Sequence, residues 1–177
     1  MLLKKYQRLF LLLLSLCVMN ACGFKPRGAL ALSDEYSPVY IQQNNMFELA
    51  RDIKRVLLSN KVSVAESKQS SKIQLTLITD ARERRVLSVD ANGRAREYLL
   101  TYKVRFSIQN NTSTIKAELA ESKSNEYTIA LTRSLLFDPD AVLAASTESD
   151  ILYKDMRRDA ARSILLKLQA LSKPTRS

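Results

Sequence analysis

The chain has 177 residues, of which 46% are hydrophobic, and a formal net charge of +10. It contains no histidine and only two cysteines, which excludes a histidine-based triad, a histidine metal site and a cysteine-rich scaffold. Three glycines are too few for a glycine-rich phosphate loop, and carboxylate pairs such as Glu118 and Glu121 are more typical of exposed strands or loops. We therefore expect no enzyme activity, no metal and no cofactor.

Residues 1–21 have the pattern of a secretory signal peptide. Three cations and no acid lie near its start, and an apolar run of 11 residues follows, which is shorter than the ~20 residues of a membrane-spanning helix. Cys22 directly follows Ala21 and precedes Gly23, an arrangement that resembles a bacterial lipobox. This predicts that Cys22 is lipid-modified and anchors the chain in the outer membrane. An ordinary secreted protein with an incidental cysteine is the alternative.

Without this leader the chain keeps a charge of +7, because the leader holds three of the cations and none of the acids. For an exported protein this charge argues against a nucleic-acid partner. It favours anionic lipid headgroups or a phosphorylated glycolipid, although it could also serve only solubility.

The first predicted elements follow a tether at 22–37, which lacks periodicity. A short strand is predicted at 38–42. Asn45, with Glu48 three residues later, predicts a capping box at the start of a helix that ends at Asn60. The apolar positions of this helix are Met46, Leu49, Ile53, Val56 and Leu57.

Two long alternating segments, 72–89 and 98–108, predict a hairpin. The Asn92-Gly93 pair between them favours a two-residue type I′ turn. Such a turn pairs residues whose numbers sum to 185, which places Leu77 opposite Ile108.

The same register places Arg82 on the polar face of the hairpin, opposite Lys103. Two facing cations repel each other unless an anion or water lies between them.

The second half of the chain predicts one last strand region, in which residues 115–119 and 127–131 alternate and the polar segment 121–125 forms a bulge or loop. Asp138-Pro139 then opens a helix that runs to about residue 170, and 173–177 form a tail. The apolar stripe of this helix is Tyr153, Met156, Ala160, Ile164, Leu168 and Leu171.

Together these elements predict an α+β fold in a single domain at 38–172: a four-stranded, mostly antiparallel sheet with two helices packed on one face. The other face of the sheet is expected to be polar and basic.

Four stretches of the chain are similar to one family of envelope proteins. They are Cys22-Gly23-Phe24-Lys25-Pro26-Arg27-Gly28, Asn92-Gly93-Arg94 followed by Glu97-Tyr98, Arg133 with Phe137-Asp138-Pro139, and Asp155-Met156-Arg157 followed by Ile164-Leu165-x-Lys167-Leu168. In this order and spacing, the chain resembles the LPS-assembly lipoproteins of the LptE family.

The resemblance implies a non-enzymatic role. LptE proteins lie inside the LptD β-barrel, act as its plug and assembly factor, and bind lipopolysaccharide (LPS) during its transport to the cell surface. The protein is therefore expected in the outer membrane, lipid-anchored, in a 1:1 complex with LptD, with its domain inside the barrel and facing the periplasm. A different outer-membrane lipoprotein, acting as an envelope assembly or binding module, is the alternative.

Some family members carry a basic LPS-contact residue just before the turn, where this chain has Ala91. The resemblance therefore suggests that cations close to the turn contact LPS, because arginine binds phosphate bidentately. These candidates are Arg94, Arg96, Arg84 and Arg85. A solvated strand face is the plain alternative. Arg133 is expected to pair with Asp138 or Glu148.

Overall fold

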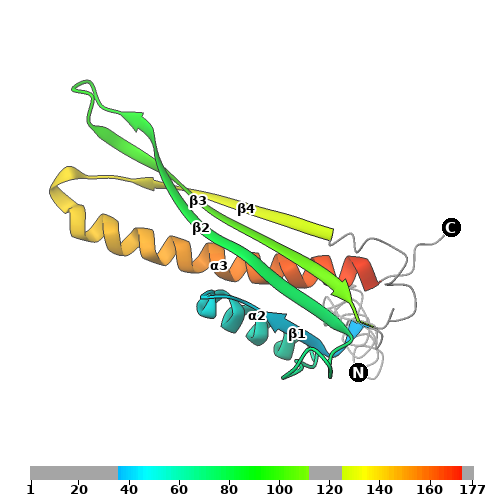
Figure 1. Ribbon diagram of the computed structural model, residues 1–177. Helices are drawn as coiled ribbons and strands as arrows, with labels where there is room; N and C mark the ends of the chain where they lie inside the picture. Colours follow the sequence, from blue (N-terminus) through cyan, green and yellow to red (C-terminus); the bar gives the residue numbers. More distant parts are fainter. Residues whose placement is uncertain (1–35, 112–124, 173–177) are drawn as a thin grey trace, which may run out of the picture.

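The computed structural model of the chain describes residues 36–111 and 125–172 (Figure 1). Its elements are β1 (Val39–Gln42), α2 (Phe47–Ser59), β2 (Ile73–Val89), β3 (Ala95–Asn110), β4 (Asn125–Leu136), the 3₁₀ turn η2 (Pro139–Ala141) and α3 (Val142–Ser172). The strands form one sheet in chain order, with β1 parallel to β2 and the other neighbours antiparallel. Both helices cover the same face (Figure 1). The predicted fold class is confirmed.

Several predicted segments lie outside the described residues. They are the leader, Cys22, most of the tether, the part of the last strand region at 115–119 and the tail at 173–177.

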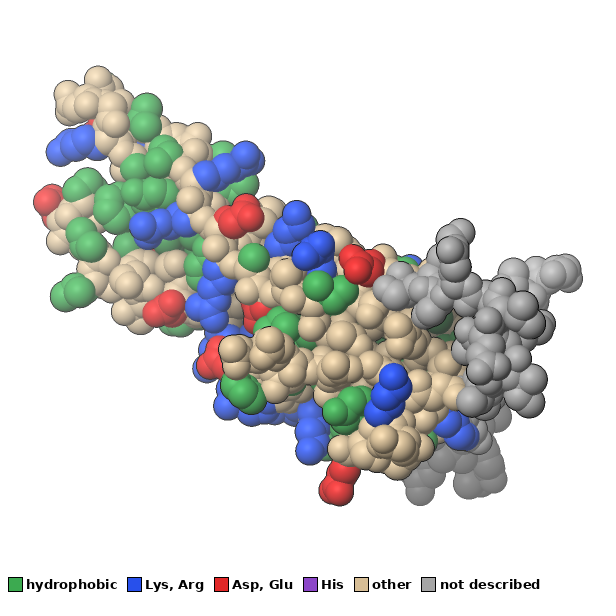
Figure 2. Space-filling view, in the orientation of Figure 1, with side chains coloured by type: hydrophobic (Ala, Val, Ile, Leu, Met, Phe, Trp, Pro, Cys, Tyr) green, Lys and Arg blue, Asp and Glu red, His purple; other side chains and the backbone are tan. Residues whose placement is uncertain are grey.

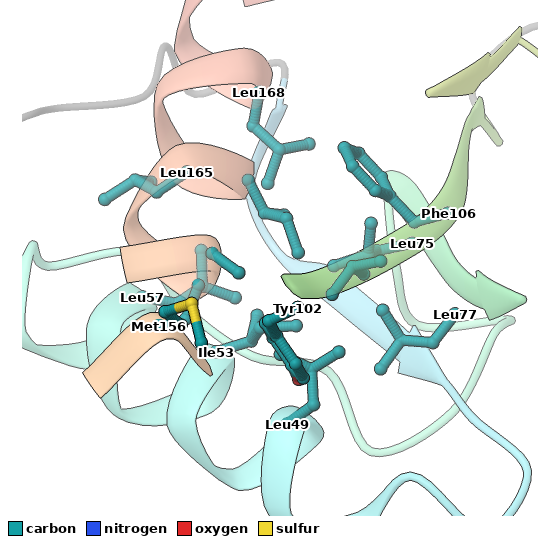
Figure 3. Close-up of a cluster of buried hydrophobic side chains, with 14 of the residues drawn as sticks. Leu49, Ile53, Leu57, Leu75, Leu77, Tyr102, Phe106, Met156, Leu165 and Leu168 are labelled. Atoms are coloured by element: carbon teal, nitrogen blue, oxygen red, sulfur yellow. The ribbon is translucent and has the colours of Figure 1, made fainter. Parts of the chain in front are cut away.

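The core forms where β3 faces the two helices, because alternate residues of β3 are apolar and point to that side. Side chains from α2, the sheet and α3 meet there (Figure 3). Burial of each large apolar side chain contributes about 1.5–3 kcal/mol. Fully buried members include Leu49, Ile53, Leu57, Leu75, Leu100, Tyr102, Val104, Phe106, Met156, Ile164 and Leu168. The predicted apolar stripes of both helices are thus confirmed.

The predicted register of the hairpin is wrong. Leu77 lies opposite Phe106 rather than Ile108, and Ile78 is an extra, unpaired residue of β2. Such a β-bulge exchanges the two faces of a strand, since side chains alternate with a period of two. Beyond the bulge, Arg82 lies opposite Tyr102, on the face that the helices cover, and not opposite Lys103 on the polar face.

The predicted start of the first helix is also wrong. Met46, not Asn45, is the N-cap of α2, and its backbone N–H donates to Oε1 of Gln43 at 2.7 Å. Asn45 instead has a positive φ of 58°. Glu48 does not close a capping box, because its carboxylate contacts arginines of the neighbouring elements.

The start of the second helix agrees with the sequence. The Asp138 carboxylate accepts a hydrogen bond from the Asp140 N–H at 2.9 Å, and Pro139 opens the turn that leads into α3. Arg133 has a different partner from those expected: its guanidinium pairs with Asp159 of α3 at 3.2 Å, which joins β4 to that helix.

Candidate functional site

The turn between β2 and β3 lies at the far end of the sheet from β1. The Gly93 N–H donates to the Asp90 carbonyl at 3.0 Å, and the Asp90 N–H donates to the Arg94 carbonyl at 2.8 Å. The loop therefore has three residues, 91–93, instead of the two of a type I′ turn. Only Gly93 has a positive φ, of 75°, which is typical of a type I turn followed by a glycine bulge.

The side chain of Asp90 fixes this turn. Its carboxylate accepts hydrogen bonds from the backbone N–H groups of Arg94 (2.9 Å) and Asn92 (2.8 Å), and it also pairs with Nε of Arg94 at 2.9 Å. The hydrogen bond from the Arg94 backbone, followed by that from its side chain, lowers the pKa of Asp90 despite some desolvation. One predicted LPS contact, Arg94, is thus already bound to a carboxylate of its own turn.

The four predicted arginines do not form one cluster. Arg96 is exposed, and its backbone carbonyl accepts from the Phe137 N–H at 2.8 Å. Arg84 lies over the ring of Tyr98, 4.8 Å from its centroid, on the helix side of the sheet. Arg85 points to the opposite face, since neighbouring residues of a strand alternate. The structure brings Arg94 and Arg96 together at the turn, whereas Arg84 and Arg85 lie further down β2 on different faces.

Exposed apolar side chains accompany these cations at the same end of the molecule (Figure 2). Leu143 is 85% exposed and Leu136 is 77% exposed. The other members are Val86, Leu87, Val89 and Val142. The hairpin end therefore presents cations and apolar groups side by side, a combination that suits an amphiphilic ligand with anionic groups.

A charged cluster with a buried arginine and a buried aspartate, which the sequence did not predict, joins the two helices. Arg157 of α3 is 5% exposed, and its Nε donates to Oδ2 of Asp52 on α2 at 2.9 Å. Its Nη1 donates to the carboxylate of Glu48, which also lies 3.7 Å from the Arg82 guanidinium. We refer to Arg157, Asp52 and Glu48 as the Arg157 cluster.

The cluster keeps Arg157 charged. Desolvation opposes the charge, but the hydrogen bond to Asp52 and the attraction of Glu48 outweigh it, so the pKa of Arg157 is raised. An arginine whose pKa is raised by folding stabilises the fold fully at every pH below its pKa in the unfolded chain. This stabilisation is lost only as the pH rises through its higher pKa in the folded protein. One sequence signal could have indicated the cluster: Arg157 lies four residues after Tyr153 and three before Ala160, which places it on the predicted apolar stripe of α3.

Tyrosines on the helix side surround the arginines of β2. The Tyr153 hydroxyl donates to the Glu83 carbonyl at 2.7 Å, and the Arg82 guanidinium lies 5.3 Å from the centroid of its ring. Burial raises the pKa of Tyr153. The pKa of Tyr102 is also raised, by burial and then by the charge of Asp80, and its hydroxyl makes no hydrogen bond with the described residues.

Two further observations concern the whole described chain. No group of three or more histidine, cysteine, aspartate or glutamate side chains within 36–111 and 125–172 is arranged to hold a metal ion. None of the helices in these ranges has the length and apolar character needed to span a membrane.

Comparison with known proteins gives consistent matches. The sequence model of a family described as "LptE: Lipopolysaccharide-assembly" matches residues 36–168. The LPS-assembly lipoprotein LptE of Photorhabdus laumondii is 28% identical over 166 residues, which cover 91% of this chain and 85% of that protein. The corresponding lipoprotein of Pectobacterium atrosepticum is 24% identical over 171 residues, with 93% and 87% covered.

Solved structures agree with this match. The solution structure of an uncharacterised lipoprotein B from Nitrosomonas europaea is 32% identical and superimposes with a TM-score of 0.67, covering 84% of this chain and 92% of that one. The crystal structure of the rare lipoprotein B from Shewanella oneidensis is 30% identical, with a TM-score of 0.62 and coverages of 75% and 94%.

Proposed function

Because the chain belongs to the LptE lipopolysaccharide-assembly family, we propose that it is the non-enzymatic partner of an LptD β-barrel, which it plugs and helps to assemble. In this role it binds LPS during transport to the cell surface. The observation that carries the proposal is the family match itself, because residues 36–168 include nearly all of the described fold and the whole hairpin. Cys22 is proposed as the lipid attachment site that holds the protein in the outer membrane.

The polar surface of the sheet supports a position inside the barrel. The side of β4 that faces away from the helices carries small and polar exposed residues, Thr128, Ala130, Thr132 and Ser134. On β3, Lys103 and Arg105 are exposed on the same side. A polar face of this kind suits the water-filled lumen of an outer-membrane barrel.

Isolation of the intact lipoprotein from outer membranes, with identification of its partner by mass, tests the proposal. We expect a stoichiometric 1:1 complex with a large outer-membrane β-barrel. A protein that is recovered alone, or with a different set of envelope proteins, would favour the alternative of another envelope assembly or binding module.

The hairpin end is the proposed LPS contact. Arg94 and Arg96 lie at the turn, Arg84 and Arg85 lie lower on β2, and exposed apolar side chains are close by. Phosphate groups of LPS would meet the cations, and its acyl or sugar portions would meet the apolar groups. Because these contacts are exposed, salt weakens them.

Replacement of both Arg94 and Arg96 by glutamate should weaken LPS binding about tenfold at low salt. The matched control is the double variant Lys68→Glu/Lys154→Glu, which reverses two exposed charges elsewhere. Equal LPS binding by the hairpin variant and its control at low ionic strength would argue against this site. If the hairpin variant lost binding to the LptD barrel as well as to LPS, the turn would instead be a contact with the barrel.

A further inference from the structure

The outward side of α2 carries a regular stripe of four exposed residues. Phe47, Arg51, Lys54 and Leu58 follow one another at spacings of four, three and four, so they lie along one line of the helix. Phe47 is 66% exposed and Leu58 is 54% exposed. The line is about 16 Å long, with an apolar side chain at each end and two cations between them. We refer to these four residues as the α2 stripe.

The charge of the α2 stripe is not balanced by the rest of the helix. The two acids of α2, Glu48 and Asp52, both point towards Arg157. No carboxylate among the described residues forms an ion pair with Arg51 or Lys54, and Lys61 adds a third such cation just beyond the end of the helix. Both acids of α2 are thus paired with Arg157, and the α2 stripe itself carries only cations and apolar groups.

We propose that the α2 stripe docks on the anionic headgroup layer of the membrane that holds the lipid anchor. Arginine and lysine bind headgroup phosphates, while a phenylalanine and a leucine at the ends of the stripe enter the boundary between headgroups and acyl chains. The composition fits a helix that lies on a membrane surface: cations and exposed apolar groups on one side, with no acid among them.

The length of the chain before the domain favours a membrane over an acidic protein as the partner. Tyr36 is 14 residues beyond Cys22, and a fully extended chain of this length reaches about 50 Å at most. An anchor at Cys22, which rests on the proposed function, would therefore keep the start of the domain, just before β1 and α2, within about 50 Å of the bilayer.

The position of α2 leaves the hairpin free for its own role. The start of α2 lies beside Asp80 and Arg82 of β2, whereas the turn lies at 90–94. These positions are roughly 26 Å apart along the strand. The hairpin end can thus enter a barrel while α2 remains at the periplasmic mouth.

A single tryptophan tests the proposal directly, because the natural chain contains none. The lipidated mature protein with Phe47→Trp is reconstituted into phosphatidylcholine vesicles with or without phosphatidylglycerol, and quenching by brominated acyl chains is measured. We expect blue-shifted emission and at least twofold stronger quenching in the anionic vesicles. Leu166→Trp, which replaces a half-exposed side chain on the β4 side of α3, outside the hairpin end, should remain water-exposed and unquenched in both.

Charge reversal identifies the cause of the contact. Arg51→Glu/Lys54→Glu in the Phe47→Trp background should remove the quenching, whereas the control Lys103→Glu/Arg105→Glu, on the opposite side of the sheet, should retain it. Circular dichroism checks that each variant is folded. All four charges are exposed, so the fold should be unaffected.

Two results would overturn the proposal: tryptophan emission of the Phe47→Trp protein that is the same in neutral and anionic vesicles, or quenching that persists after charge reversal. If the charge-reversed variant is still quenched in vesicles but no longer isolates with the barrel from outer membranes, the stripe is a contact with a protein. Failure of the unmodified protein to isolate with a barrel would count against the proposed function only, because the vesicle measurement does not involve the barrel.

Discussion

Arg157→Met tests whether the Arg157 cluster holds the two helices together. Methionine keeps most of the volume of arginine but leaves the Asp52 carboxylate, whose side chain is 6% exposed, without its main partner. Removal of one member of a buried ion pair costs about 3–5 kcal/mol. The Arg55 guanidinium still reaches Asp52 at 3.3 Å, so we expect a loss near the lower end, about 3 kcal/mol.

Urea denaturation of the mature protein, followed by circular dichroism, measures this loss. With a slope of about 2 kcal/mol/M, a loss of ~3 kcal/mol lowers the midpoint by about 1.5 M. An unchanged slope would show that the unfolding transition still exposes the same surface.

The double variant Arg157→Met/Asp52→Leu separates the unpaired charge from lost packing. Replacement of a whole buried pair by apolar groups is often neutral or stabilising, so the double variant should lie within about 1 kcal/mol of the natural protein. The reasoning is refuted if Arg157→Met costs less than about 1 kcal/mol, or if the two substitutions simply add.

Three further predictions concern the sheet. Gly93→Val should destabilise the protein by about 1–3 kcal/mol in thermal denaturation, because a β-branched residue would have to adopt a φ of 75° there. No atom lies within 4 Å of the new Cβ, so Gly93→Asn should cost less, and an equal loss for both variants would indicate a steric clash instead. Tyr102→Phe should leave the unfolding free energy unchanged or raise it by up to ~1 kcal/mol, since it removes an unpaired buried hydroxyl; a loss above about 1 kcal/mol would mean that this hydroxyl has a partner. Because the pKa of Asp90 is lowered, its carboxylate stabilises the turn at every pH above its ordinary pKa of 3.8, and this effect is lost as the pH falls through the lowered pKa. The amide chemical shift of Arg94 in NMR should therefore titrate with a midpoint below pH 3.8. A midpoint above pH 3.8 would contradict the hydrogen bond from Arg94 to Asp90.

Local patterns predicted the elements of this fold well. The alternation of β3 and the apolar stripes of α2 and α3 repeat often enough to outweigh single irregular residues, and Asp138-Pro139 marked the start of the second helix. The chain order of the elements and their one-sided apolar faces then favoured the α+β arrangement that the structure has.

Register and pairing were harder to predict, because each depends on residues that are distant in sequence. The Asn92-Gly93 pair is common in two-residue turns, yet the Asp90 side chain accepts two backbone hydrogen bonds and stabilises a three-residue loop. A capping box at Glu48 was plausible locally, but Arg157, 109 residues away, binds that carboxylate instead. The candidate LPS contacts at Arg94 and Arg96 stay a prediction.

The extra residue Ile78 of β2 shifts the alternation of the following side chains by one position. Before it, odd-numbered side chains such as Leu77 lie on the helix side of the sheet; after it and as far as Val86, even-numbered ones such as Arg82 and Arg84 do so. Deletion of one residue at this point would turn these arginines outward and turn Glu83 inward. When relatives are aligned, a one-residue gap here therefore changes which charges lie beneath the helices, even where every other residue of the strand is the same.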